Sequence, residues 1–176
     1  MAGKEHGRGI EREIGKLLVA GGNTVAVAES CTGGLLGARI TSISGSSRYF
    51  TGGIIAYSNE AKTRILGVSG TTLDRCGAVS REVAGQMASG VMKNLKSDVG
   101  IAITGIAGPD GGTAGKPVGL VYIGLAWKNG RMARKFLFLG GRERIRESAV
   151  ESAMDILRKH IKKQGVSHGK ETRREG

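Results

Sequence analysis

Side chains that could do chemistry gather in short segments that follow apolar runs of this sequence. Ser30 lies in "AESCTGG" beside a cysteine and ahead of a glycine pair, and Lys62 lies in "AYSNEAK". The three histidines, His6, His160 and His168, stand near the termini, which disfavours a Ser-His-Asp triad. Lysine is the usual alternative base for a serine nucleophile, provided that burial or a nearby cation lowers its pKa. These residues therefore suggest acyl transfer by a serine and a lysine.

Three serines compete for the role of nucleophile, and the residues alone leave the choice open. Ser30 follows one predicted strand, Ser47 lies in the glycine-punctuated "SGSSRYF", and Ser58 stands four residues before Lys62. Ser58 is also expected to cap a helix, and each serine could simply satisfy turn hydrogen bonds. Tyr57 could complete a proton relay with Lys62, although a lysine at this place also fits an ordinary solvated helix residue.

Two further segments could bind a ligand. Thr104 ends an apolar run that opens into "GIAGPDGG", whose glycines would let the backbone approach a ligand closely. Arg142 and Arg146 stand one turn apart after a glycine pair, and such guanidinium forks bind phosphate well. A flexible connector and a solvated basic helix face are the competing interpretations. Cys31 has no basic group placed to make a thiolate, so we interpret it as a small buried residue.

The pattern of apolar residues predicts alternating helices and strands. Helices are expected at 9–20, from a Thr32 cap to 43, from a Ser58 cap to about 67, from a Ser80 cap over Val83, Met87, Val91 and Leu95, and at 143–163. Strands are expected at 23–28, 53–57, 99–104, 120–127 and 132–139, the last two joined by a hairpin. This alternation predicts a single α/β domain with three layers (α/β/α) and a mixed, mostly parallel central sheet.

The unusual segments share one position in this predicted fold. "ESCTGG", "YSNEAK" and "TGIAGPDGG" each follow a predicted strand. In α/β sheets, ligands bind in the crevice beyond the carboxyl ends of the strands. We therefore expect the three segments to form one site.

The composition excludes several classes of protein. Hydrophobic residues make up 39% of the 176 residues, enough for a core, while the 31 glycines form no repeat. No apolar run reaches the roughly 18 residues of a membrane span, and the N-terminus is too charged for a signal peptide. We therefore expect a cytoplasmic protein without membrane association. The two cysteines match no zinc spacing, and neither a metal nor an organic cofactor is expected.

The strong positive charge raises nucleic acid as a partner. The chain has 27 Lys and Arg against 15 Asp and Glu, giving a net charge of +12. Much of the excess lies in 128–146 and 158–176, and we interpret 1–165 as the domain and 166–176 as a basic, disordered tail. Aromatic residues, which stack on single strands, make up only 4%. No specific nucleic-acid partner is therefore expected.

Several motifs, in order along the chain, resemble one known family. "VAESCTGG", "GSSRYFTGGIIAYSNEAK", "GAVSREVAGQMA", "GIAGPDGG" and "KPVGLVYIG" are similar to the C-terminal domain of the competence- and damage-inducible CinA family. The resemblance covers about residues 8–160. The stand-alone form of this domain is nicotinamide-nucleotide amidohydrolase, or NMN deamidase. The resemblance thus implies hydrolysis of nicotinamide mononucleotide (NMN) to nicotinic acid mononucleotide and ammonia, in pyridine nucleotide recycling and without a cofactor.

The resemblance also implies roles for individual residues. Ser47 matches the expected nucleophile, Lys62 the general base and Tyr57 its partner. The residues expected to line the substrate site are Ser30, Thr32, Gly33, Thr104, Gly105, Gly108 and Arg142. The family acid beside the arginine is absent, because this chain has "GGR" where "GDR" is usual.

The sequence also allows another interpretation. The chain could be a nucleotide-binding or regulatory module of the same family that lacks the chemistry. Exposed apolar helix faces in so small a domain also suggest a homo-oligomer.

Overall fold

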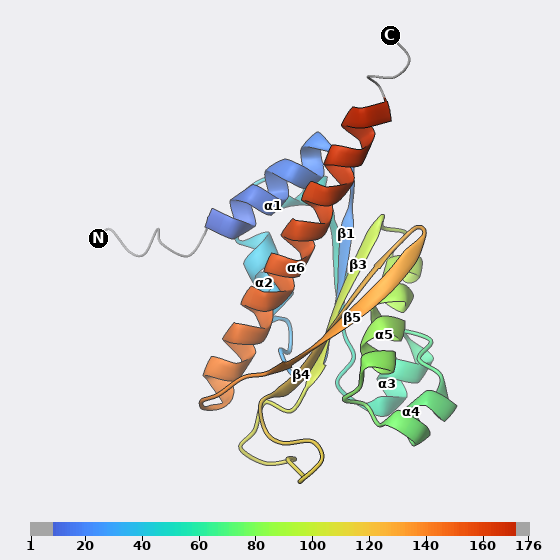
Figure 1. The fold of residues 1–176 in the computed structure, drawn as a ribbon, viewed down its shortest axis with the longest axis vertical. Coiled ribbons are helices and arrows are strands. Elements are labelled where there is room, and N and C mark those ends of the chain that lie inside the picture. The colour runs from blue at the N-terminus through green and yellow to red at the C-terminus, as the bar shows by residue number, and fades with distance from the viewer. Residues whose placement is uncertain (1–8, 172–176) are drawn as a thin grey trace, which may run out of the picture.

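The fold is a five-stranded sheet with helices on both faces (Figure 1). The computed structural model describes residues 9–171, with side chains through residue 164. In chain order the elements are α1 (Gly9–Ala20), β1 (Val25–Glu29), α2 (Leu35–Thr41), η2 (Ser46–Arg48), β2 (Phe50–Ile55), α3 (Asn59–Arg64), α4 (Gly70–Cys76), α5 (Arg81–Asn94), β3 (Val99–Gly105), β4 (Leu120–Trp127), β5 (Gly130–Leu137) and α6 (Arg142–Glu171).

The sheet is mixed, as predicted. Its strand order is β2-β1-β3-β4-β5, in which β1 pairs in parallel with both β2 and β3. The β3–β4 and β4–β5 pairs are antiparallel, and β4–β5 is the expected hairpin. All five residues of β1 are buried, as expected for a central strand that is covered on both faces.

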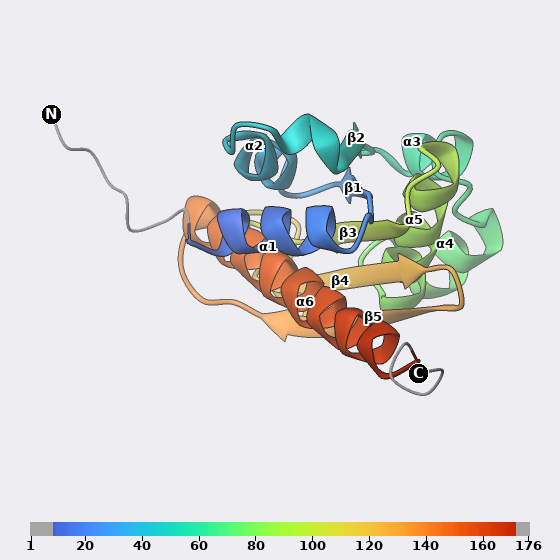
Figure 2. The same ribbon diagram turned by 90° about the horizontal axis from the view of Figure 1, so that it is seen from above.

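Two apolar cores lie on opposite faces of the sheet. One core joins α1, α2 and α6 to the sheet through residues such as Leu18, Leu36 and Met154. The other joins α5 and the α3–α4 region through Leu66, Val83 and others. The two views show α6 crossing one face and α5 covering the other (Figures 1 and 2). The predicted three-layer arrangement is confirmed.

Local signals located most helix starts correctly, with one correction. The Ser58 and Ser80 hydroxyls cap α3 and α5 by accepting from Ala61 N and Val83 N. The prediction that Thr32 caps α2 is wrong, because α2 begins after Gly34 and has no side-chain bond from its N-cap. Its amides are bonded by a carboxylate further upstream, described below.

Differences from the prediction lie mainly in short elements and helix ends. The helix α4 and the turn η2 were not predicted. The helix α6 continues through Glu171 instead of ending at 163, so residues 166–171 of the expected tail are helical. Residues 172–176 lie outside the described residues. Within the described part, no helix is both long and apolar enough to cross a membrane.

Candidate active site

Lys62 is the most unusual side chain of the fold, because its amine is buried. It lies on α3, directly beyond the carboxyl end of β2, and only 1% of its surface is exposed. Its Nζ lies 3.0 Å from Ser30 Oγ, 3.0 Å from the carbonyl oxygen of Ala56 and 3.1 Å from that of Tyr57. No ion pair among the described residues involves this lysine. Its environment therefore stabilises the amine by hydrogen bonds and not by a carboxylate.

This environment shifts the amine toward its neutral form. Burial lowers the pKa of Lys62 by removing water from its charged form, and this effect outweighs the opposing electrostatic contribution of Cys31. A neutral amine has two N–H donors and one lone pair. The carbonyls of Ala56 and Tyr57 can only accept, so they take both donors. The lone pair is then left for the Ser30 hydroxyl proton, the arrangement needed for Lys62 to act as a general base.

The sheet brings Ser30 and Lys62 together. Ser30 follows β1 and Lys62 follows β2, and these neighbouring strands run parallel with Glu29 opposite Ile55. Their carboxyl ends therefore meet, and Ser30 N is held there by a 3.0 Å bond to Ile103 O on β3. Ser30 is 8% exposed, so its hydroxyl lies just beneath the surface.

The turn after Ser30 is built by the glycine pair and by a buried carboxylate. Gly33 and Gly34 have φ values of 58° and 97°, a backbone conformation that residues with a side chain rarely adopt. The Glu29 carboxylate accepts bonds from the amides of Gly34, Leu36 and Gly37 at 3.1, 3.1 and 2.8 Å. Glu29 thus replaces the expected hydroxyl cap at the start of α2 and fixes the turn that carries Ser30.

Two buried residues lie beside Ser30 in this turn. Burial raises the pKa of Cys31 to about 11, so its thiol stays protonated, in agreement with the prediction of an inert buried cysteine. Thr32 is fully buried, and its hydroxyl has no hydrogen-bond partner among the described residues. The Thr32 carbonyl accepts a 2.7 Å bond from Arg146 of α6. Within the described residues, the amides of Cys31 and Thr32 donate no hydrogen bond to another residue.

Arg142 connects two of the segments that were expected to form the site. Its Nη1 donates a 2.8 Å bond to the Gly108 carbonyl, and its Nη2 lies 3.3 Å from the Tyr57 hydroxyl. The loop after β3 is thereby tied to the segment that leads into α3. Arg142 itself is exposed at the first turn of α6, where it can also meet a solvent-borne anion.

The end of β3 forms the back of the site. Thr104 is buried, and its hydroxyl donates to the Ala78 carbonyl at 2.9 Å. A Cβ on Gly105 would lie 2.8 Å from Leu120 O, and one on Gly108 would lie 2.6 Å from the Val118 side chain. Gly105 is therefore needed for close packing of β3 against Leu120, and Gly108 for close packing of the following loop against Val118, structural reasons that are independent of any ligand.

Ser47 does not meet Lys62 within the chain. It lies exposed on η2, before β2 begins, whereas Lys62 follows the other end of β2. The six residues of β2 span roughly 17 Å at 3.3 Å per residue. The structure thus pairs Lys62 with Ser30 in place of the expected Ser47. The Tyr57 side chain is 61% exposed and its hydroxyl contacts Arg142, so only the Tyr57 carbonyl reaches the amine.

The predicted positions of the strands along the chain already distinguish Ser30 from Ser47. Ser30 follows a strand, as Lys62 does, whereas Ser47 precedes one. In neighbouring parallel strands, only residues that lie beyond the same end of both strands can meet.

No group of three or more metal-ligating side chains was found among the described residues.

Taken together, the fold and the site define an α/β protein with a buried serine–lysine pair at the carboxyl ends of its parallel strands. Residues 8–161 match the family model of the CinA C-terminal domain, and the chain belongs to this family. The predicted resemblance is confirmed.

Individual relatives agree with this membership. A CinA-like protein of Acaryochloris marina is 53% identical over 154 residues, which cover 86% of this chain and 37% of the relative. A CinA-like protein of Syntrophomonas wolfei is 54% identical over 144 residues, which cover 82% of this chain and 35% of the relative. The chain therefore spans little more than a third of the length of these relatives.

The fold is similar to solved structures as well. The crystal structure of a competence/damage inducible protein from Agrobacterium tumefaciens is 41% identical with a TM-score of 0.83, covering 85% of this chain and 92% of that one. A CinA superfamily protein from Enterobacter cloacae is 31% identical with a TM-score of 0.85, covering 92% and 98% of the two chains.

Proposed function

We propose that this protein hydrolyses the carboxamide of NMN, giving nicotinic acid mononucleotide and ammonia. The observation that carries the proposal is the buried contact of 3.0 Å between Lys62 Nζ and Ser30 Oγ. A buried lysine without a carboxylate partner weakens the fold, and a protein that only bound a nucleotide would have no use for it.

The reaction begins with attack by a serine hydroxyl on the amide carbon. Lys62 takes the hydroxyl proton as the new C–O bond forms, and the resulting ammonium then donates that proton to the departing nitrogen. Ammonia leaves and an acyl ester of the serine remains. A water molecule next attacks the ester while Lys62 removes its proton, and return of that proton to the serine oxygen releases the acid. Dividing the hydrolysis of a poor electrophile into two steps in this way lowers each barrier.

Ser30 is the serine that this geometry supports as the nucleophile, since its hydroxyl is the one within reach of the Lys62 lone pair. The family resemblance had pointed to Ser47, and the two assignments predict opposite effects of substitution. The amides of Cys31 and Thr32, next to the attacking oxygen, are suited to hold the tetrahedral oxyanion. Each such donor contributes roughly 3 kcal/mol to transition-state stabilisation.

The rest of the site suits a mononucleotide. Arg142 and Arg146 stand one turn apart at the start of α6, and both contact segments that flank Ser30 and Lys62. Their remaining guanidinium donors can bind the substrate phosphate. Tyr57 presents an exposed ring beside Arg142, where it can pack against the ribose or the nicotinamide.

The test is to incubate the purified protein with NMN and measure ammonia together with nicotinic acid mononucleotide. We expect turnover in the parent protein and its loss, by at least about a thousandfold, in Ser30→Ala and Lys62→Met. Ser47→Ala and the exposed Lys93→Met are the matched controls and should keep nearly full activity. A parent protein that binds NMN without releasing ammonia would favour the regulatory module. Activity retained in Lys62→Met would refute the mechanism.

A further inference from the structure

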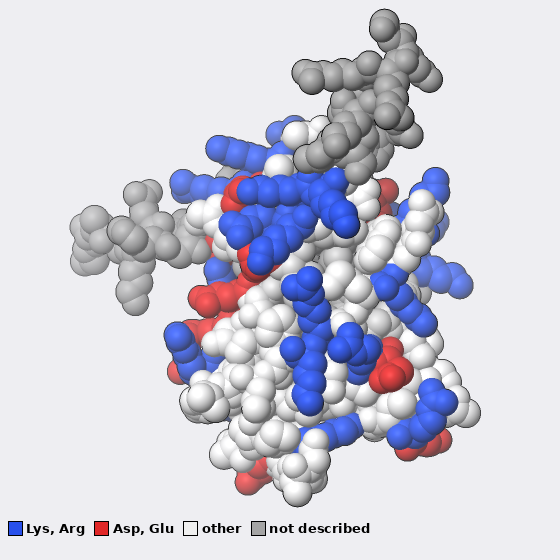
Figure 3. Space-filling view, viewed as in Figure 1, with Lys and Arg blue, Asp and Glu red and all other residues white. Residues whose placement is uncertain are grey.

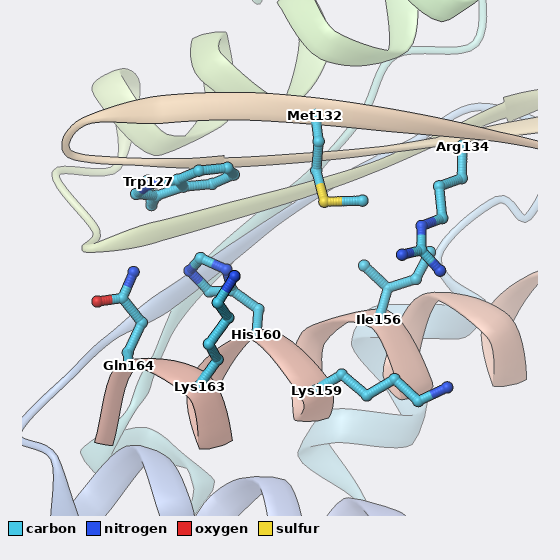
Figure 4. Close-up of a pocket in the computed structure, with 8 residues that line it drawn as sticks. All are labelled: Trp127, Met132, Arg134, Ile156, Lys159, His160, Lys163 and Gln164. Carbon is cyan, nitrogen blue, oxygen red and sulfur yellow. The ribbon is translucent and has the colours of Figure 1, made fainter. Parts of the chain in front are cut away.

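A cleft lies between β5 and α6, away from Ser30 and Lys62 (Figure 4). It has a volume of about 420 Å³. Trp127 in this cleft pairs with Val99 at the first residue of β3, whereas Thr104 near the other end of β3 lies by the candidate active site. The seven residues of β3 span roughly 20 Å at 3.3 Å per residue. The cleft is therefore separate from the site described above.

An aromatic surface forms one end of the cleft. The Trp127 indole is partly exposed, and its ring centre lies 4.7 Å from that of His160, with an angle of 44° between the rings. Met132 and Ile156 continue the apolar lining from β5 and α6. In Figure 4 the Trp127 and Met132 side chains face the helix from the hairpin, and His160 faces them from below. Such a surface accepts a planar ring by stacking.

The remaining lining is cationic. Arg134, Lys159 and Lys163 line the cleft, and no Asp or Glu does. Lys159 forms a 2.6 Å ion pair with Asp155, whereas Arg134 forms none among the described residues. On this face, Lys and Arg side chains gather over α6 and β5 with uncharged surface between them (Figure 3). The local charge therefore favours an anion.

The adjoining cleft limits where that anion can lie. It has a volume of about 390 Å³, shares Arg134 and Lys159 with the first, and is lined also by Glu151 and Asp155. These carboxylates repel a negative group, so an anion is directed toward the Trp127 end.

His160 provides a polar group beside the aromatic surface. Its Nε2 is buried without a hydrogen-bond partner among the described residues. Burial lowers the pKa of His160, and the Lys163 charge acts in the same direction, so the imidazole is neutral at neutral pH. The His160 ring therefore lines the cleft without adding a positive charge to it.

We propose that this cleft binds a nucleotide, with the base against Trp127 and the phosphate between Arg134 and Lys163. Its volume falls within the range of about 300–1,000 Å³ usual for small-molecule sites. A stacking surface next to a group of cations is complementary to a planar base joined to a phosphate. The inference does not depend on the proposed deamidation, because it uses none of the residues of that site.

The single tryptophan of the chain, Trp127, makes the test local. Its emission is followed while AMP, adenosine, ribose 5-phosphate or inorganic phosphate is added. We expect a saturable change with AMP and at least about tenfold weaker binding of the other three, because each lacks the base or the phosphate. Absence of a saturable change with AMP would overturn the proposal. Equal affinity for inorganic phosphate, or a response only to a single-stranded oligonucleotide, would overturn it too.

Variants locate the site. Arg134→Gln should weaken AMP binding by about tenfold through loss of a charge-assisted hydrogen bond. Lys135→Gln on the same strand is the matched control, because adjacent side chains of a strand point to opposite faces. Arg142→Gln tests for binding at the other site and should leave the signal unchanged. Equal effects of the Arg134 and Lys135 changes, or loss of the signal in Arg142→Gln, would contradict the assignment.

Discussion

The stability of a Lys62→Met variant should depend on pH differently from that of the parent protein. In the unfolded chain, this lysine holds its proton up to about pH 10.4. In the folded chain, burial lowers its pKa, so the proton is released at a lower pH. Between the two values the unfolded state binds more protons than the folded state, and stability therefore rises with pH.

The magnitude of this effect follows from linkage and from the contacts. Over the interval between the two pKa values, the parent gains up to about 1.4 kcal/mol per pH unit relative to Lys62→Met. Above the interval, the Lys62 amine is neutral in both the folded and the unfolded chain, and the parent has reached its full gain in stability. The variant then lacks the bonds to Ser30, Ala56 and Tyr57, and we expect it to be less stable by about 1–3 kcal/mol. Below the interval, the penalty of charging the buried amine reduces or reverses this difference.

Urea unfolding of both proteins at a series of pH values between 7 and about 10.5 measures the difference directly. Lys93→Met, on the exposed last turn of α5, serves as the control and should follow the parent at every pH. Parallel curves for the parent and Lys62→Met would refute the reasoning, because they would show that the lysine has the same pKa folded and unfolded.

Two further predictions concern the same region. Glu29→Ala leaves three amides at the start of α2 without their acceptor, so we expect a loss of about 3 kcal/mol in unfolding free energy. Glu29→Gln retains an acceptor and should lose less; equal losses in urea unfolding would contradict this account. The kcat/KM for NMN should rise with pH through a pKa below 10.5, the ordinary value for lysine, because neutral Lys62 is the active form. A profile that is flat up to that pH would contradict the assigned role of Lys62.

Much of the fold could be predicted because local signals and packing agree. The helix α1 was predicted with its observed bounds, since its apolar spacing and the glycine pair after it both mark the same segment. The Ser58 and Ser80 caps each bond an amide only three residues further along the chain, so both partners of the bond can be recognised in the sequence. The hairpin of β4 and β5 was located for the same reason.

The start of α2 could not be predicted by such local rules. Thr32 has the right residue type for a cap, but the Glu29 carboxylate reaches over the turn and bonds the first amides instead. This arrangement depends on the left-handed conformations of Gly33 and Gly34, which bend the chain back over the end of β1. The helix α4 was missed because its seven residues are too few to show an apolar period.

The candidate site was predicted in its location but not in its contacts. The three segments after β1, β2 and β3 do meet, as the topology of parallel strands requires. The burial of Lys62 has no local signal, because the same sequence would suit a solvated helix face. It results from the place of α3 directly after β2, beside the parallel strand β1, which brings the Lys62 amine to Ser30.

Identification of the acylated serine tests the central claim most directly. The protein is mixed with NMN, and the reaction is stopped with acid within one turnover. The protein is then digested, and the masses of its peptides are measured by mass spectrometry. If neutral Lys62 activates the neighbouring hydroxyl, the ester of nicotinic acid mononucleotide will be found on the peptide that contains Ser30. An ester on Ser47, or the same ester in the Ser30→Ala protein, would contradict that claim.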